Sequence, residues 1–166
     1  AFEKWLNCPH VHAFEKGECD RNQFADGMLD YFDLKIGRQE FLDGFVSWPQ
    51  EVFPGSEEVV ADIRPDIRVG CLNNTSELHW NNQKSSAILN QMFDLRFLSY
   101  QMGQLKPDQA IYVEVAERLD CAPESILFFD DNLANVESAK EVGLNAHLTS
   151  GAHEARAILE KSNLLK

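Results

Sequence analysis

The sequence predicts an α/β protein with a Rossmann-like parallel sheet, preceded by a purely helical segment. After about residue 65, short apolar runs alternate with stretches of helical periodicity, an order typical of a layered parallel sheet. Before that point, apolar residues recur at helical spacing and no run has the pattern of a strand. We therefore predict two domains, a helical domain over residues 1–60 and a Rossmann-like core over residues 61–166.

The helical segment is rich in aromatic residues that form stripes along its helices. One stripe runs through Phe24, Met28 and Phe32, and another joins Phe41 to Phe45. Such a concentration of rings could mark an apolar ligand pocket, but we prefer the interior of a small helical bundle. A helical unit of this size beside an α/β domain could also act as a lid.

The elements of the second half follow one another in a regular order. The predicted strands and helices cover, in turn, residues 67–72, 75–91, 97–100, 107–119, 126–129, 132–142, 144–148 and 152–160. Pro107 stands at a helix start, where proline is tolerated, and Gly143 stands where a helix C-cap belongs. Right-handed crossovers between consecutive strands would make the sheet parallel.

Composition and charge exclude several classes of partner. The formal net charge of −12 disfavours nucleic acid and anionic membrane, because both require a basic surface. No apolar run is long enough to span a bilayer, and no signal-peptide pattern opens the chain. The four cysteines are scattered without a Cys-x-x-Cys pair, which is typical of a reduced, cytoplasmic protein. We expect a cytoplasmic location, and the oligomeric state is not readable from the sequence.

Two adjacent acids, Asp130 and Asp131, follow the strand predicted over residues 126–129 and precede a helical pattern. Ligands of open parallel sheets lie beyond the carboxyl ends of the strands. Paired carboxylates at that edge suit a hard divalent cation such as Mg²⁺. Alternatively, Asp131 or Asn132 only caps the helix. The complete strand–acid–acid–helix unit favours the metal.

Two other predicted loops bring groups that could bind an anion. Asn73 and Asn74 end the first strand, where backbone N–H groups at the next helix start favour an anion, although Asn74 or Thr75 could simply cap that helix. Lys106 precedes Pro107 opposite the acids, and it could neutralise a phosphate rather than remain a solvated charge. With a carboxylate-bound metal, these groups describe a phosphoryl-transfer site.

Three segments, in this order, resemble the second, third and fourth motifs of the haloacid dehalogenase-like hydrolases. They are Val69-Gly-Cys-Leu-Asn-Asn-Thr75, Gly103-Gln-Leu-Lys-Pro-Asp108 and Ile126-Leu-Phe-Phe-Asp-Asp-Asn132. Residues 1–60, with Pro9-His-Val-His-Ala-Phe-Glu-Lys-Gly-Glu18, are similar to the four-helix cap of the phosphatase-like branch of that family. The resemblance covers essentially the whole chain.

The resemblance implies a Mg²⁺-dependent phosphatase that acts on a small phosphorylated metabolite. Lys106 would be catalytic, because it holds the phosphate and steadies the nucleophile. Asp131 would coordinate Mg²⁺, with Asp130 as a further ligand or as a base beside it. Asn73 would bind phosphate with its amide where the family has a Ser or Thr hydroxyl, and Asn74 would assist it.

The family's nucleophile, the first Asp of an Asp-x-Asp motif, lies at the tip of a central strand that precedes the cap. No such strand occurs in this sequence, so we expect the chain to be an incomplete version of a longer polypeptide. Two alternatives stay open. A 2-haloacid dehalogenase shares the fold but needs no metal, and the paired acids argue against it. A non-catalytic binding protein is favoured by Asn73 and by the missing nucleophile.

Overall fold

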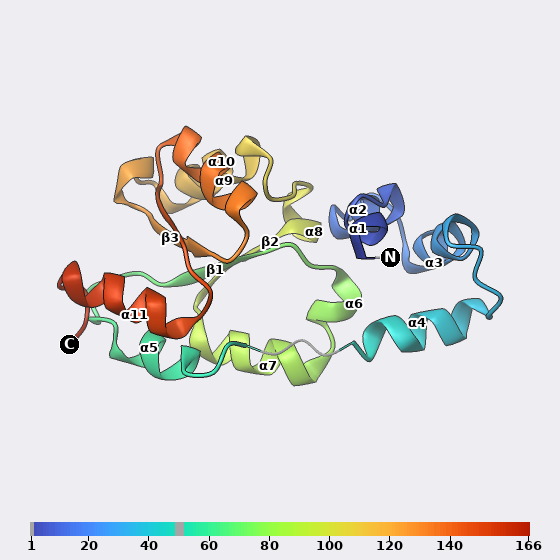
Figure 1. Cartoon of the computed structure of the whole chain (residues 1–166), viewed down its shortest axis with the longest axis horizontal. Coiled ribbons are helices and arrows are strands. Elements are labelled where there is room, and N and C mark those ends of the chain that lie inside the picture. The colour runs from blue at the N-terminus through green and yellow to red at the C-terminus, as the bar shows by residue number, and fades with distance from the viewer. Residues whose placement is uncertain (1, 49–51) are drawn as a thin grey trace. The chain divides into compact units, whose positions relative to one another are not determined.

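The computed structural model describes residues 2–48 and 52–166, and Figure 1 shows helices followed by alternating strands and helices. The chain forms two compact units that interleave along the sequence. Unit 1 comprises Ala1–Glu51, Leu72–Leu89 and Phe97–Leu105, and unit 2 comprises Val52–Cys71, Asn90–Arg96 and Lys106–Lys166. These units do not coincide with the predicted domains, residues 1–60 and 61–166. The assignment of a cap and a core stays a prediction.

Unit 1 opens with helices whose aromatic faces pack together. They are α1 (Phe2–Leu6), α2 (Pro9–Glu15), α3 (Arg21–Tyr31) and α4 (Arg38–Val46). Phe24, Phe41 and Phe45 of the predicted stripes are buried in one cluster with Phe14. The rings of Phe14 and Phe24 stack with 4.2 Å between their centroids. The preferred interpretation of the stripes, as the interior of a helical bundle, is therefore confirmed.

The α/β class is confirmed by the rest of the chain. Its elements are α5 (Ser56–Asp62), β1 (Gly70–Asn73), α6 (Glu77–Trp80), α7 (Gln83–Met92), β2 (Leu95–Leu98), α8 (Ser99–Met102), α9 (Gln109–Leu119), the short 3₁₀ helix η1 (Pro123–Ser125), β3 (Leu127–Asp130), α10 (Leu133–Val142), β4 (Asn145–Leu148) and α11 (Ala152–Lys161). Within the described residues the strands pair two by two, β1 with β2 and β3 with β4. None of the described helices has the length and apolar character needed to cross a membrane.

Several predicted element bounds were wrong. The strand predicted over residues 97–100 ends earlier, because Ser99 already belongs to α8. The helix predicted to open at Pro107 begins at Gln109, after Asp108 as its N-cap residue. The helix predicted over residues 75–91 is two helices, α6 and α7. Residues 2–48 and 52–62 hold five helices, where the resemblance implied four up to residue 60.

In unit 2, β3 and β4 run parallel and α10 packs against both strands and against α9. The register pairs Phe128 with Ala146 and Asp130 with Leu148. Val136 and Ala139 bury the inner face of α10. The helix ends at Gly143, whose left-handed φ of 104° suits glycine and confirms the predicted C-cap. This packing places the carboxyl end of β3 beside the first turn of α10.

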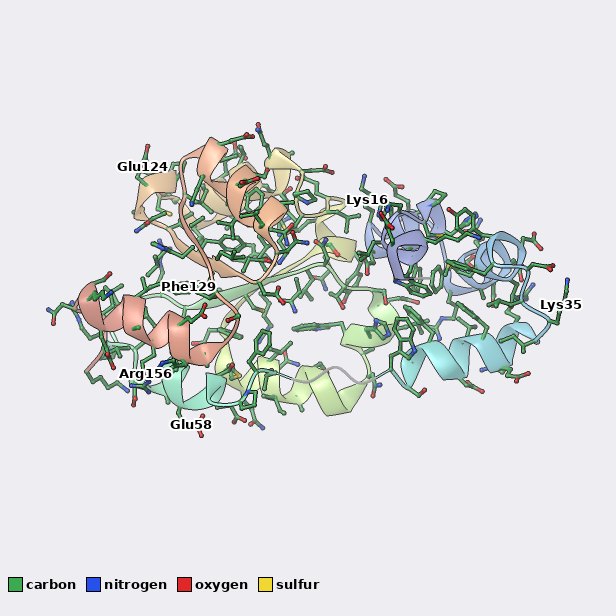
Figure 2. The ribbon with its side chains drawn as sticks, in the orientation of Figure 1. Lys16, Lys35, Glu58, Glu124, Phe129 and Arg156 are labelled. Atoms are coloured by element: carbon green, nitrogen blue, oxygen red, sulfur yellow. The ribbon has the colours of Figure 1, made fainter. Side chains whose placement is uncertain are left out.

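A second helix pair in unit 2 brings together segments that are far apart in sequence. Figure 2 labels Glu58 on α5 and Arg156 on α11. Arg156 Nη2 lies 2.6 Å from Oδ2 of Asp62, the last residue of α5. A β-bridge between Ile63 and Leu165 closes the same pair.

Gly17 and Gly103 of unit 1 permit a test of the close approach between the Gly17 backbone and the backbone of Tyr100. We expect Gly17→Ala to cost about 3 kcal/mol of stability and Gly103→Ala about 1 kcal/mol, because both replacements force an L residue into the left-handed region but only one adds a steric clash. The φ angles are +70° and +71°, and a Cβ on Gly17 would lie 2.4 Å from the Tyr100 carbonyl oxygen. Nothing lies within 4 Å of a Cβ on Gly103. Equal losses in urea denaturation would contradict the close approach.

A buried histidine predicts a pH effect on unit 1. The ring of His79 stacks on Phe45 at 4.0 Å between centroids, and its Nε2 donates to the Phe45 carbonyl oxygen at 2.8 Å. Burial lowers the pKa of His79 below its usual 6.5. The unfolded chain therefore binds more protons than the folded protein in the window below about pH 6.5, so stability falls as the pH decreases through it.

We expect the stability difference between the wild-type protein and the His79→Gln variant to shrink as the pH is lowered from 7 to 5. Denaturant unfolding at several pH values measures this difference. The contributions of the other titrating groups to the free energy of unfolding are the same in both proteins and cancel in the difference. A difference that is constant over this range would show that His79 has an unshifted pKa.

Candidate functional site

A nearly buried ion pair joins the segment before α9 to the carboxyl end of β3. Lys106 Nζ donates to Asp130 Oδ2 at 2.6 Å, and the two side chains are only 12% and 5% exposed. The ammonium also lies 5.8 Å from the ring centre of Phe128. Charge-assisted hydrogen bonds of this length are among the stronger ones in proteins. The predicted proximity of Lys106 to the acidic pair is therefore confirmed, while the roles of these residues stay predictions.

The carboxylate of Asp130 is fixed by further hydrogen bonds. Its Oδ1 accepts from the backbone N–H of Asn132 at 2.8 Å and from Nδ2 of Asn135 at 3.0 Å. Its carbonyl oxygen accepts from the backbone N–H of Thr149, just after β4, at 3.0 Å. Both carboxylate oxygens therefore have partners, so the side chain has one orientation.

Asp131 has a different environment from that of its neighbour. Its side chain is exposed, and within the described part of the chain its carboxylate makes no hydrogen bond or ion pair. Asn132, not Asp131, caps α10, because its Oδ1 accepts from the Ala134 N–H at 2.9 Å. The capping alternative is thus correct for Asn132 only.

The donor set at this edge fits Mg²⁺. Asp131 offers free carboxylate oxygens next to the fixed carboxylate of Asp130. Among the described residues no group of three or more His, Cys, Asp or Glu side chains gathers as a metal cage. Mg²⁺ does not require one, since it usually keeps several waters and takes one or two carboxylates together with substrate phosphate.

Asn73 and Asn74, the predicted phosphate-binding residues, lie in unit 1. Asn73 is the partly buried last residue of β1, and Asn74 follows it on the surface. The predicted capping of the next helix by Asn74 or Thr75 was wrong, because Ser76 Oγ accepts from the His79 N–H at 3.4 Å and so caps α6. Whether Asn73 and Asn74 share a site with Lys106 stays a prediction.

A buried serine holds the segment after β1. Ser99 Oγ accepts from the Thr75 N–H and donates to the Thr75 carbonyl oxygen, both at 2.9 Å. The Thr75 N–H therefore already has a partner, so it is not one of the anion-binding amides that the sequence suggested. The two bonds tie Thr75 to the first residue of α8, directly after β2.

Two residues of α10 were missed by the sequence reasoning. Asn135 is buried and bonds Asp130, and the Ser138 hydroxyl donates to the carbonyl oxygen of Pro107. One signal was available, because Asn135 precedes the buried Ala139 by four residues and so interrupts the apolar stripe of the helix with an amide. No comparable signal marks Ser138, whose partner lies 31 residues earlier.

A buried tyrosine supports the first turn of α10. The hydroxyl of Tyr112 donates to the backbone carbonyl oxygen of Asn135 at 2.9 Å, and its ring packs edge-on against Phe128. Burial, and then the charges of Asp130 and Asp108, raise the pKa of Tyr112. The phenol therefore stays a neutral hydrogen-bond donor.

Comparison with known proteins identifies the family. Residues 13–143 match the family model of the haloacid dehalogenase-like hydrolases. The chain belongs to this family. The match includes the described ion pair, Asp131 and the whole of α10.

Two similar proteins are named as a phosphatase and as a flavin mononucleotide hydrolase. "Phosphorylated carbohydrates phosphatase" of Thermotoga maritima is 27% identical over 110 residues, which are 64% of this chain and 51% of that protein. "Flavin mononucleotide hydrolase 1" of Arabidopsis thaliana is 30% identical over 148 residues, 84% of this chain and 57% of that protein. The chain therefore spans about half the length of these relatives.

A solved structure supports the fold. The crystal structure of a haloacid dehalogenase family enzyme from Bacteroides thetaiotaomicron superposes with a TM-score of 0.78 and 21% identity. The superposition covers 95% of this chain and 81% of that chain. This likeness confirms the predicted α/β fold.

The buried ion pair predicts a non-additive response to mutation. We expect Lys106→Met to destabilise the protein by about 3 kcal/mol, because the Asp130 carboxylate would remain buried without its cation. Adding Asp130→Asn should restore much of this loss, since the neutral amide still offers an acceptor oxygen to Asn132 and Asn135. Urea denaturation compares the two variants. A double variant no more stable than Lys106→Met would contradict this account.

Proposed function

We propose that the protein is a Mg²⁺-dependent phosphatase that hydrolyses a small organic phosphomonoester. The observation that carries this proposal is the buried Lys106–Asp130 pair beside the exposed carboxylate of Asp131 at the end of β3. Two kinds of relative support it. The relative from Thermotoga maritima is named a phosphatase of phosphorylated carbohydrates and that from Arabidopsis thaliana a flavin mononucleotide hydrolase, and the enzyme from Bacteroides thetaiotaomicron has been crystallised with magnesium and inorganic phosphate.

In this proposal Lys106 binds the substrate phosphate. Its ammonium is held by Asp130 at 2.6 Å, so its charge is oriented before substrate arrives. A preorganised cation stabilises the charge on a transferring phosphoryl group without reorganisation during the reaction. Asp130 is the positioning partner of Lys106, and Asp131 is the group that would hold Mg²⁺ at this strand end.

When bound, Mg²⁺ would act as a Lewis acid on the phosphoryl oxygens. The protein's own groups have complementary tasks. Asn73 and Asn74 donate amide hydrogen bonds to the phosphate, as the family's second motif implies. The helices over residues 1–60 serve as the lid that excludes water during the reaction.

The experiment is hydrolysis of p-nitrophenyl phosphate by the full-length protein, with and without Mg²⁺. We expect Mg²⁺-dependent turnover that Lys106→Ala reduces about 100-fold, because a preorganised group facing the transferred phosphoryl is lost. Asp131→Asn should weaken apparent Mg²⁺ affinity by about tenfold or more. The matched control is Glu124→Gln, which removes one exposed carboxylate at the other end of β3 and should change neither value (Figure 2).

The same assay separates the alternatives. Metal-independent release of halide from 2-chloropropionate, without phosphatase activity, would identify a dehalogenase. A full-length protein that neither hydrolyses a panel of sugar and nucleotide monophosphates nor binds Mg²⁺ in calorimetry would be a binding protein. Equal activity with and without Mg²⁺ would reject the proposed metal role of Asp131.

A further inference from the structure

We propose that Asn135 and Ser138 are positioning residues that together set the place of the Lys106 ammonium. The inference rests on the proposed function in so far as Lys106 binds phosphate. It adds two residues of α10 that act on Lys106 from two sides without touching it. Asn135 acts through the carboxylate that Lys106 binds, and Ser138 acts through the backbone next to Lys106.

The first connection runs through Asp130. Asn135 is buried, and its Nδ2 donates to Asp130 Oδ1 at 3.0 Å, while Lys106 holds Oδ2 of the same carboxylate. With both oxygens occupied, the carboxylate cannot rotate about χ2 without losing a hydrogen bond. Removal of the Asn135 amide leaves only the Asn132 N–H on Oδ1, so the direction of Oδ2, and of the ammonium bound to it, is less determined.

The second connection runs through Pro107. The Ser138 hydroxyl donates to the carbonyl oxygen of Pro107, the residue that directly follows Lys106. This bond ties the segment before α9 to α10. Ser138 is only partly buried and its replacement by alanine removes a hydroxyl and nothing else, so the fold should tolerate the change.

The two connections share one helical surface. Asn135 and Ser138 stand three residues apart on α10, and residues at this spacing are neighbours on one face of a helix. The Tyr112 hydroxyl fixes the backbone of the same turn through the Asn135 carbonyl oxygen. One rigid turn thus holds the carboxylate partner of Lys106 and the chain adjacent to Lys106. Neither residue needs to contact substrate.

The direct test measures how readily an amine-reactive reagent reaches Lys106 in the native, full-length protein. Acetic anhydride at low dose, followed by peptide mass spectrometry, gives the labelling rate of Lys106 relative to that of the exposed Lys140 of α10. We expect this ratio to rise about fivefold in Ser138→Ala, which loses a neutral hydrogen bond. In Asn135→Ala, which loses a hydrogen bond to a charged carboxylate, we expect a rise of about tenfold. Ser138→Thr, which keeps the hydroxyl, should restore the wild-type ratio.

Ser125→Ala is the matched control. The Ser125 hydroxyl also donates to a backbone carbonyl oxygen, that of Ala122, at 2.6 Å, but it lies before β3, at the end of the strand away from Asp130. This variant should leave the labelling ratio unchanged. An unchanged ratio in both α10 variants, or a rise of equal size in Ser125→Ala, would overturn the proposal.

Kinetics separates this inference from the proposed function. With p-nitrophenyl phosphate, Ser138→Ala should raise KM about fivefold, Ser138→Thr should restore it, and Ser125→Ala should leave it unchanged. If the wild-type protein hydrolyses no phosphomonoester, the proposed function fails while the labelling ratio still decides the positioning role. If turnover is normal and the labelling ratio equals that of the wild-type protein in both Ser138→Ala and Asn135→Ala, the positioning role fails and the phosphatase stands.

Discussion

The need to accommodate one buried ion pair organises the end of β3. Removing an ammonium and a carboxylate from water costs several kcal/mol for each ion, and their attraction offsets this only when the remaining hydrogen-bonding capacity is satisfied. Here neighbouring residues supply the hydrogen bonds that the carboxylate needs. Asn132, Asn135 and Lys106 engage both carboxylate oxygens of Asp130, and α10 brings two of these three donors in its cap and first turn. The local structure at this edge follows from that requirement.

Apolar packing, rather than the ion pair, stabilises the structure around the end of β3. Val136 and Ala139 on the inner face of α10 are almost fully buried, as are Ile111 and Tyr112 on α9. Apolar burial of this kind contributes about 1.5–3 kcal/mol for each large side chain, whereas a buried pair contributes little net stability. The apolar stripes therefore keep α9 and α10 in place, and the polar residues between them use that rigidity to orient charges.

Much of the fold and part of the site could be predicted from sequence periodicity. Strand ends of a parallel sheet meet at one edge, which is why Lys106 and Asp130 could be expected together although 24 residues separate them. The bonds of Ser99 to Thr75 and of Ser138 to Pro107 could not be predicted, because a serine carries no periodic signal and its partner is set by tertiary packing. The start of α9 was predicted at Pro107 but lies at Gln109, because proline is tolerated at a helix start without requiring one there.

The burial of the ion pair also bears on how the protein responds to ionic strength. Exposed pairs such as Arg21–Glu77 lie in solvent, where counterions at physiological concentration screen charges over about 8 Å. The Lys106–Asp130 pair is shielded from those counterions by the side chains around it. Added salt would therefore weaken the surface pairs of a protein with a net charge of −12 while the local charge arrangement at the end of β3 persists. Within the acidic doublet, only the exposed Asp131 would then respond to the ionic composition of the medium.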